Sequence, residues 1–221
     1  HDSIGPRLWS ALCRELSVDD KVDWSGPLIQ KWVLLLAQTC PGNSLAELCH
    51  LLRKVVKTAP HTLGMVLLRR LISLRTVMTT AVDFAALMKG GDTIETKDKA
   101  EFEITLAGEA HELEVVWDYL LKQHLSDLAE PLIVLLEDRI REGHEIYRTA
   151  ERGNATYDPN CFRGRIYERD AYRTGRGMNV VLDCLLDVVE MHSKQGPGLT
   201  ATRIESWLLS RVPVLVRLGL Y

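Results

Sequence analysis

Apolar residues recur every three to four positions along almost the whole chain, a spacing that places them on one face of a helix. The first three predicted helices carry these residues at Leu8, Trp9, Leu12 and Leu16, then at Ile29, Trp32, Val33, Leu35 and Leu36, then at Leu45, Leu48, Leu51, Leu52, Val55 and Val56. Pro27 suits the first turn of the second helix. Ser44 with Glu47 forms a capping-box pattern before the third. The short connections predict that successive helices pack antiparallel.

The helical spacing continues through the rest of the chain. It predicts a helix pair over residues 62–75 and 76–89, which ends at Gly90-Gly91. Later helices are predicted from Glu109 to Leu121, from Ser126 to Tyr147, from Val180 to Val189, from about Ile204, and from Pro213 onward. Pro131 is expected within about the first turn of the helix that Ser126 caps, where its missing N–H costs little.

Residues 92–108 differ from their surroundings because they are charged and because Phe102, Ile104 and Leu106 alternate with polar residues. This stretch is predicted to be a boundary, formed by an ordered loop or at most a short edge strand. It divides the chain into N-terminal helical pairs at 1–91, a charged connector at 92–108 and C-terminal helical pairs at 109–221. Because the sequence starts at His1 and stops within an apolar helical pattern, we expect one continuous segment of a larger protein.

The predicted fold class is all-α. About ten helices joined mostly by short turns are typical of stacked helical pairs. No strict sequence period is present, so two arrangements remain open: an irregular helical-pair solenoid (HEAT- or TPR-like) and a compact helical bundle.

Composition narrows the function classes. Hydrophobic residues make up 46% of the chain, which is enough to bury a core, and the formal net charge of −3 provides no surplus positive field. Nucleic acid and an anionic membrane are therefore not expected as primary partners. No secretory signal or apolar run of roughly 18 residues is present. Five cysteines without a C-x-x-C pair favour a cytoplasmic location.

Candidate catalytic residues are few, and the chain is predicted not to be an enzyme. Glycine pairs such as Gly90-Gly91 lack the preceding strand and lysine of a phosphate-binding loop, and the seven histidines are dispersed, so no cofactor or metal site is expected. The alternative is a helical effector enzyme whose site is assembled from distant residues. Its candidates are Cys161, which has Arg163 and Arg165 nearby to lower its pKa, and His144.

The most informative segment is the long loop at residues 151–177, which is rich in arginine, tyrosine and glycine. Arginine and tyrosine dominate binding hot spots because they bury a large area and keep a directional polar group. The predicted partner-binding residues are Phe162, Arg163, Arg165, Tyr167, Arg169, Tyr172 and Arg173. Alternatively, the arginines pair with Asp158, Glu168 and Asp170 and only attach the loop to the helices.

The second half of the chain resembles a helical region of large bacterial anti-phage defence proteins, which include STAND-type NTPases and sirtuin-associated relatives. The parallels are Trp117, Phe162-Arg163, Ile166-Tyr167-Glu168, Val180 to Val189, Trp207-Leu208-Leu209-Ser210, Pro213 and Arg217-Leu218. In such proteins the catalytic modules lie elsewhere on the chain. The resemblance therefore implies a sensor or scaffold whose partner is a protein, either a phage component or other domains of the same chain. A structural spacer or an oligomerisation module is the alternative.

Overall fold

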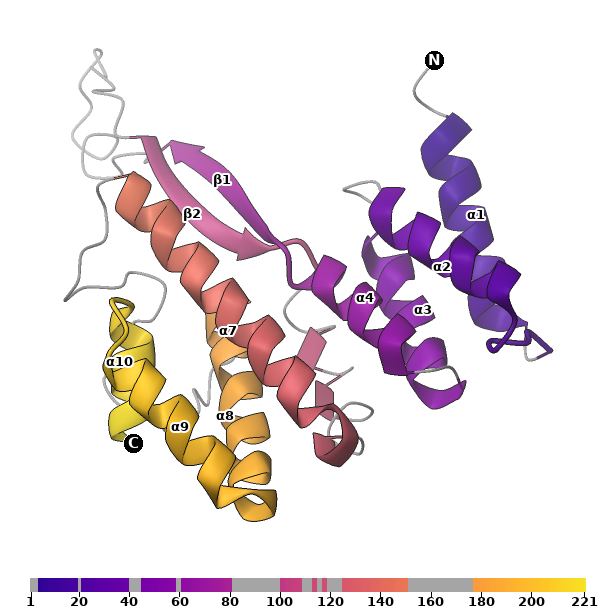
Figure 1. Cartoon of the computed structure of the whole chain (residues 1–221). Coiled ribbons are helices and arrows are strands. Elements are labelled where there is room, and N and C mark those ends of the chain that lie inside the picture. Colours follow the sequence, from indigo (N-terminus) through magenta and orange to yellow (C-terminus); the bar gives the residue numbers. More distant parts are fainter. Residues whose placement is uncertain are drawn as a thin grey trace, which may run out of the picture.

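The computed structural model describes residues 4–19, 21–39, 45–58, 61–80, 100–108, 113–114, 117–118, 125–150 and 177–221. In this part the fold is all-α, with eight helices and a single two-stranded sheet (Figure 1). The helices are α1 (Ile4–Val18), α2 (Pro27–Thr39), α3 (Leu45–Thr58), α4 (His61–Leu71), α7 (Leu125–Thr149), α8 (Gly177–Gln195), α9 (Pro197–Leu208) and α10 (Pro213–Leu220). The strands are β1 (Leu74–Thr80) and β2 (Ala100–Leu106).

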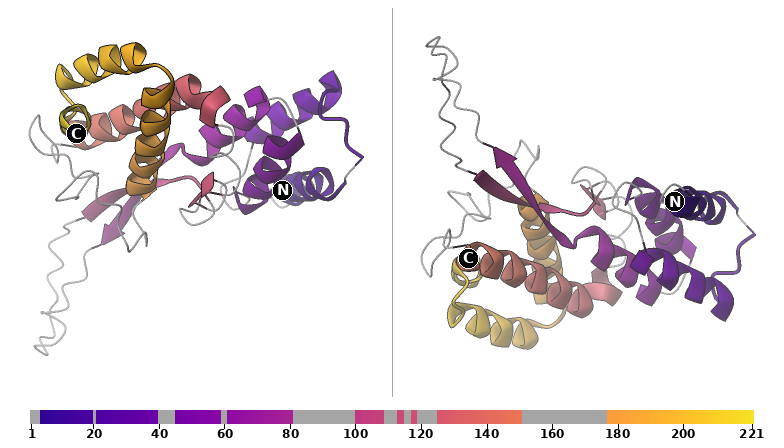
Figure 2. Two further views of the ribbon diagram at one scale, coloured as in Figure 1. Left: turned by 90° about the horizontal axis from the view of Figure 1, so that it is seen from below. Right: turned by 90° about the horizontal axis from the view of Figure 1, so that it is seen from above.

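Helices α1 to α4 gather at one end of the molecule and α7 to α10 at the other, with the sheet beside α7 and α8 (Figures 1 and 2). Within the N-terminal group, α1 packs on α3 and α2 packs on α4. Within the C-terminal group, α8 packs on both α7 and α9. The all-α class is thus confirmed, and solenoid and bundle remain the two descriptions of it.

The sheet corrects the predicted helix pair at 62–75 and 76–89. The first helix, α4, ends at Leu71, and residues 74–80 form β1, which pairs antiparallel with β2. One contribution is local, since Thr76, Val77, Thr79 and Thr80 are all β-branched and lose rotamer freedom in a helix. Pairing with β2 is the other. Residues 81–89 lie outside the described part.

Strand β2 confirms that the alternation in the charged connector marks a short strand. Ile104 and Leu106 on β2 are buried, and they pair in register with Thr76 and Leu74 of β1. The sheet therefore pairs a strand from the predicted N-terminal region with one from the predicted connector.

Two predicted helix boundaries in the C-terminal group are wrong. Helix α7 begins at Leu125, before the expected cap Ser126, so Pro131 is its seventh residue and lies beyond the first turn. Pro131 is exposed, and its ring removes one helical hydrogen bond on the solvated side. Helix α9 begins at Pro197 and not near Ile204, because proline is well suited to the first helical position. The starts of α2 at Pro27 and α10 at Pro213 are as predicted.

One hydrophobic core includes residues from both ends of the molecule, from Trp9 in α1 to Leu218 in α10. Hydrogen bonds from two buried tryptophan side chains connect segments of this core that are far apart in the sequence. Trp9 Nε1 donates to the carbonyl of Leu36 at 3.0 Å, and Trp117 Nε1 donates to Asp187 Oδ2 at 2.9 Å. None of the described helices combines the length and the apolar character that crossing a membrane requires.

Candidate functional site

Most residues that the sequence singled out for function lie outside the described part. These are Phe162, Arg163, Arg165, Tyr167, Arg169, Tyr172 and Arg173, together with Cys161 and the rest of residues 151–176. The partner-binding loop therefore stays a prediction. His144 is described and is buried within α7. Among the described residues, no group of three or more histidine, cysteine or acidic side chains could hold a metal ion.

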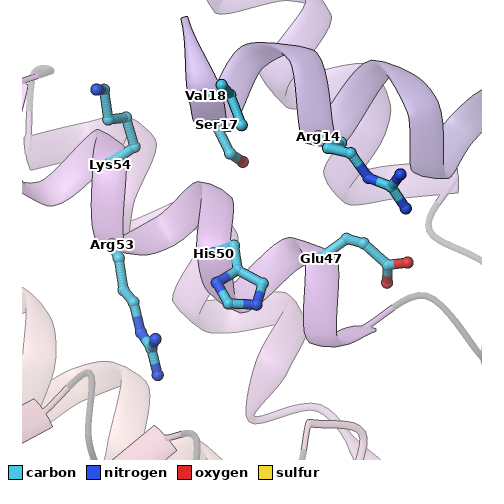
Figure 3. A pocket seen from close by; sticks show the side chains of 7 residues that line it. All are labelled: Arg14, Ser17, Val18, Glu47, His50, Arg53 and Lys54. Carbon is cyan, nitrogen blue, oxygen red and sulfur yellow. The ribbon is translucent and has the colours of Figure 1, made fainter. Parts of the chain in front are cut away.

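The structure instead shows a pocket between α1 and α3, with a volume of about 590 Å³ (Figure 3). It is lined by Arg14, Ser17 and Val18 from α1 and by Glu47, His50, Arg53 and Lys54 from α3. Arg14 and Lys54 lie toward opposite ends of this α1–α3 pocket and His50 lies between them (Figure 3). Sequence reasoning did not identify this site.

Helical periodicity explains why these residues meet. On α3, Leu48, Leu51, Leu52 and Val55 are buried in the core, while positions 47, 50 and 54 share another face of the same helix. On α1, the burial of Trp9 and Cys13 leaves residues 14, 17 and 18 at the border of the packed face. The packing of α1 on α3 then brings the two polar borders together.

Charged side chains of both signs line the pocket. Among the described residues that line it, Arg14, Arg53 and Lys54 are basic and Glu47 is acidic. The chain as a whole carries −3. In the part that the structure describes, the buried Nε of Arg53 has no hydrogen-bond acceptor.

A second surface lies on α2. Leu28, Trp32 and Leu35 are exposed to 66%, 40% and 47%, although their i, i+4 and i+7 spacing places them on one helix face. We call these three residues the α2 apolar stripe. The sequence pattern groups Trp32 and Leu35 with Val33 and Leu36 as apolar residues of this helix, but only the latter two are buried. The apolar residues of α2 therefore extend over more of its surface than α1 and α4 cover.

A third cluster joins α7 to α9. Arg203 donates from Nη1 to Glu137 Oε2 at 2.9 Å and from Nη2 to Glu130 Oε1. Glu137 also accepts two hydrogen bonds from Arg141, at 2.6 and 3.2 Å. Arg141 lies one helical turn after Glu137, and the side chain of Glu137 is only 12% exposed, so this pair does not lie on a fully solvated face. Because every charge in this cluster has an opposite partner, its role is to attach α9.

His192 extends this cluster into α8. Its Nδ1 lies 3.0 Å from Thr200 Oγ1, and its Nε2 lies 3.7 Å from Glu130 Oε2. The imidazole and Thr200 are both buried, so the contact fixes the turn between α8 and α9.

Comparison of the chain with family models, with curated proteins and with solved structures gave no match. The α2 apolar stripe and the α1–α3 pocket are therefore the features of the structure that bear on function.

Proposed function

We propose that this chain is a non-catalytic protein-interaction segment, a sensor or scaffold within a cytoplasmic bacterial anti-phage defence protein. The observation that carries the interaction role is the α2 apolar stripe. The defence context is supported by the sequence resemblance of the second half of the chain.

The α2 apolar stripe suits a helical partner. Three large apolar side chains along two turns are the pattern that one helix presents to another, and tryptophan is enriched at the centres of binding surfaces. Lys31, which is exposed, is the one charged residue of α2. The partner segment is thus an amphipathic helix whose apolar face is bordered by acidic residues opposite Lys31.

Site-specific photo-crosslinking tests this proposal in bacteria with and without phage infection. A benzophenone amino acid at position 38, an exposed residue of α2, should crosslink a protein partner. Trp32→Ala should reduce the product at least tenfold, which corresponds to about 1.4 kcal/mol of binding. A product that requires infection indicates a sensor, and one formed in both conditions indicates a scaffold.

The matched controls separate binding from misfolding. Leu209→Ala removes another exposed apolar side chain, 86% exposed and distant from α2 in sequence, and should leave the product unchanged. A benzophenone at position 194 on α8 should give no such product. A crosslink whose mass is twice that of the chain contradicts the proposal and supports the oligomerisation alternative. A product that persists in Trp32→Ala contradicts it as well.

A further inference from the structure

Strand β1 forms one edge of the two-stranded sheet (Figure 1), and its register shows which backbone groups point outward. The N–H of Ala107 donates to the carbonyl of Ser73 at 2.7 Å, which fixes the phase of the antiparallel ladder. The odd-numbered residues of β1 therefore bond to β2, whereas Leu74, Thr76 and Met78 direct their N–H and C=O groups away from it. In the part of the chain that the structure describes, no third strand meets these groups.

The outer edge of β2 differs because other elements lie against it. Ile104 is opposite Thr76 in the register, so its N–H also points out of the sheet, and it donates to the hydroxyl of Tyr147 on α7 at 3.4 Å. Strand β2 packs on α8 as well, and the side chain of Ile104 is buried. By contrast, Thr76 and Val77 in the middle of β1 are exposed. Among the described residues, β1 thus provides the one sheet edge that is open to another strand.

We propose that β1 pairs antiparallel with β1 of a second copy of this chain, which gives a dimer with a four-stranded sheet of order β2, β1, β1, β2. The two-fold axis passes beside Val77. Residue 76 then lies opposite residue 78 of the second copy, and residue 74 lies opposite residue 80. Each outward N–H and C=O group of β1 meets a complementary group in this register.

Val77 favours this register. Its side chain is 41% exposed and lies on the face of the sheet opposite to that of the buried Ile104 and Leu106. On the axis it faces Val77 of the second copy in a non-hydrogen-bonded pair, where side chains approach closely and two β-branched residues pack well. Arg75 is the one charged residue of β1, and it lies opposite residue 79 of the second copy. No like charges therefore oppose each other across the pair.

A second copy suits this edge better than a flexible peptide. The second β1 is already an ordered strand, whereas a flexible peptide loses backbone entropy when it becomes one. The seven residues of β1 include no lysine and no proline, the residues that commonly protect a strand edge from pairing. Because the outer edge of β2 is covered, each copy contributes one edge and the assembly closes as a dimer.

Sedimentation equilibrium of the 221-residue chain between about 1 and 100 μM tests the proposal. Wild type should shift from monomer to dimer over this range and form no larger species. Val77→Lys should weaken the dimer at least tenfold, because it opposes two like charges on the axis at a position exposed enough to accept lysine in the monomer. Val134→Lys, at a 44% exposed valine of α7, is the matched control and should dimerise like wild type.

Disulfide formation tests the register. Val77→Cys should form an intermolecular disulfide under mild oxidation, because residue 77 lies opposite its own copy within the reach of a disulfide. Thr79→Cys should not, since the two copies of residue 79 are about 13 Å apart along the strands. Mass spectrometry of peptides distinguishes this disulfide from those of the five native cysteines.

The proposal is overturned if wild type stays monomeric up to about 100 μM, or if it forms species larger than a dimer. It is also overturned if Val134→Lys weakens the dimer as much as Val77→Lys does, or if Thr79→Cys crosslinks as readily as Val77→Cys. Trp32→Ala should leave the dimer intact, and loss of the dimer in this variant would place the contact on α2 instead. The dimer of β1 and the partner of the α2 apolar stripe can therefore fail separately.

Discussion

Near the end of α7, the exposed residues Glu145 and Arg148 form a side-chain contact that lowers the pKa of Glu145. Arg148 donates from Nε and Nη2 to Glu145 Oε2 at 2.9 and 2.8 Å. These hydrogen bonds hold the pKa of Glu145 below its ordinary value of 4.5, against a smaller desolvation effect that raises it. The same contact raises the pKa of Arg148.

Removal of this partner should be visible in the titration of Glu145. Arg148→Gln should raise the pKa of Glu145 toward 4.5, as followed by NMR of the carboxyl carbon. Because the folded pKa is the lower one, the pair stabilises the fold above pH 4.5 and this contribution is lost as pH falls through the folded pKa. Lys194→Gln, on α8, should leave the titration unchanged. An unaltered pKa of Glu145 in Arg148→Gln would assign the shift to another cause.

At the scale of elements, Arg203 is the residue that attaches α9 to α7. It bridges Glu130 and Glu137, and the side chains of Arg203 and Glu137 are only 21% and 12% exposed. An ion pair that is largely shielded from water contributes more than a surface pair, and its loss leaves carboxylates with fewer donors.

We expect Arg203→Met, which keeps the apolar stem, to lower the free energy of unfolding by about 1–3 kcal/mol. Urea denaturation measures this change, and hydrogen exchange should show faster exchange over residues 197–208. Arg211→Met, at an exposed arginine between α9 and α10, is the control and should change stability by less than about 0.5 kcal/mol. Equal effects of the two substitutions would show that the α7–α9 cluster is not what attaches α9.

Most elements could be predicted from periodicity, and the failures have physical causes. Residues 76–80 are apolar enough for a helix, but their β-branched side chains and the alternating partner Phe102–Leu106 favour a strand, and only the pairing of the two segments decides. The extent of α9 was missed because its first two turns, Pro197 to Arg203, have few apolar residues.

The candidate site was less predictable than the fold. Arg14 and Lys54 are ordinary charged positions in the sequence, and no spacing shows that α1 will pack on α3. The available signal was the position of cations at the border of two apolar helix faces. The exposure of Trp32 could not be predicted either, because periodicity identifies an apolar helix face but does not show whether another element covers that face.

At the scale of the whole molecule, the two groups of helices share one core. The sheet connects them, since the carbonyls of Ser73 and Leu71 accept hydrogen bonds from Ala107 and Gly108, both at 2.7 Å. Strand β2 then packs on α8, and the N–H of Ile104 donates to the hydroxyl of Tyr147 on α7 at 3.4 Å. These contacts link α1 to α4 with α7 to α10 through the sheet.

This continuity predicts cooperative unfolding. Leu52→Ala removes a fully buried side chain of α3, which should cost about 2–5 kcal/mol, and hydrogen exchange should then accelerate in α8 as well as in α3. Leu8→Ala, at an exposed position of α1, should accelerate neither helix. If only α1 to α4 lost protection, the two groups would be separate folding units, with the boundary at residues 92–108 that the sequence pattern predicts. Coincident loss would instead show that the sheet and both groups of helices unfold as a single unit.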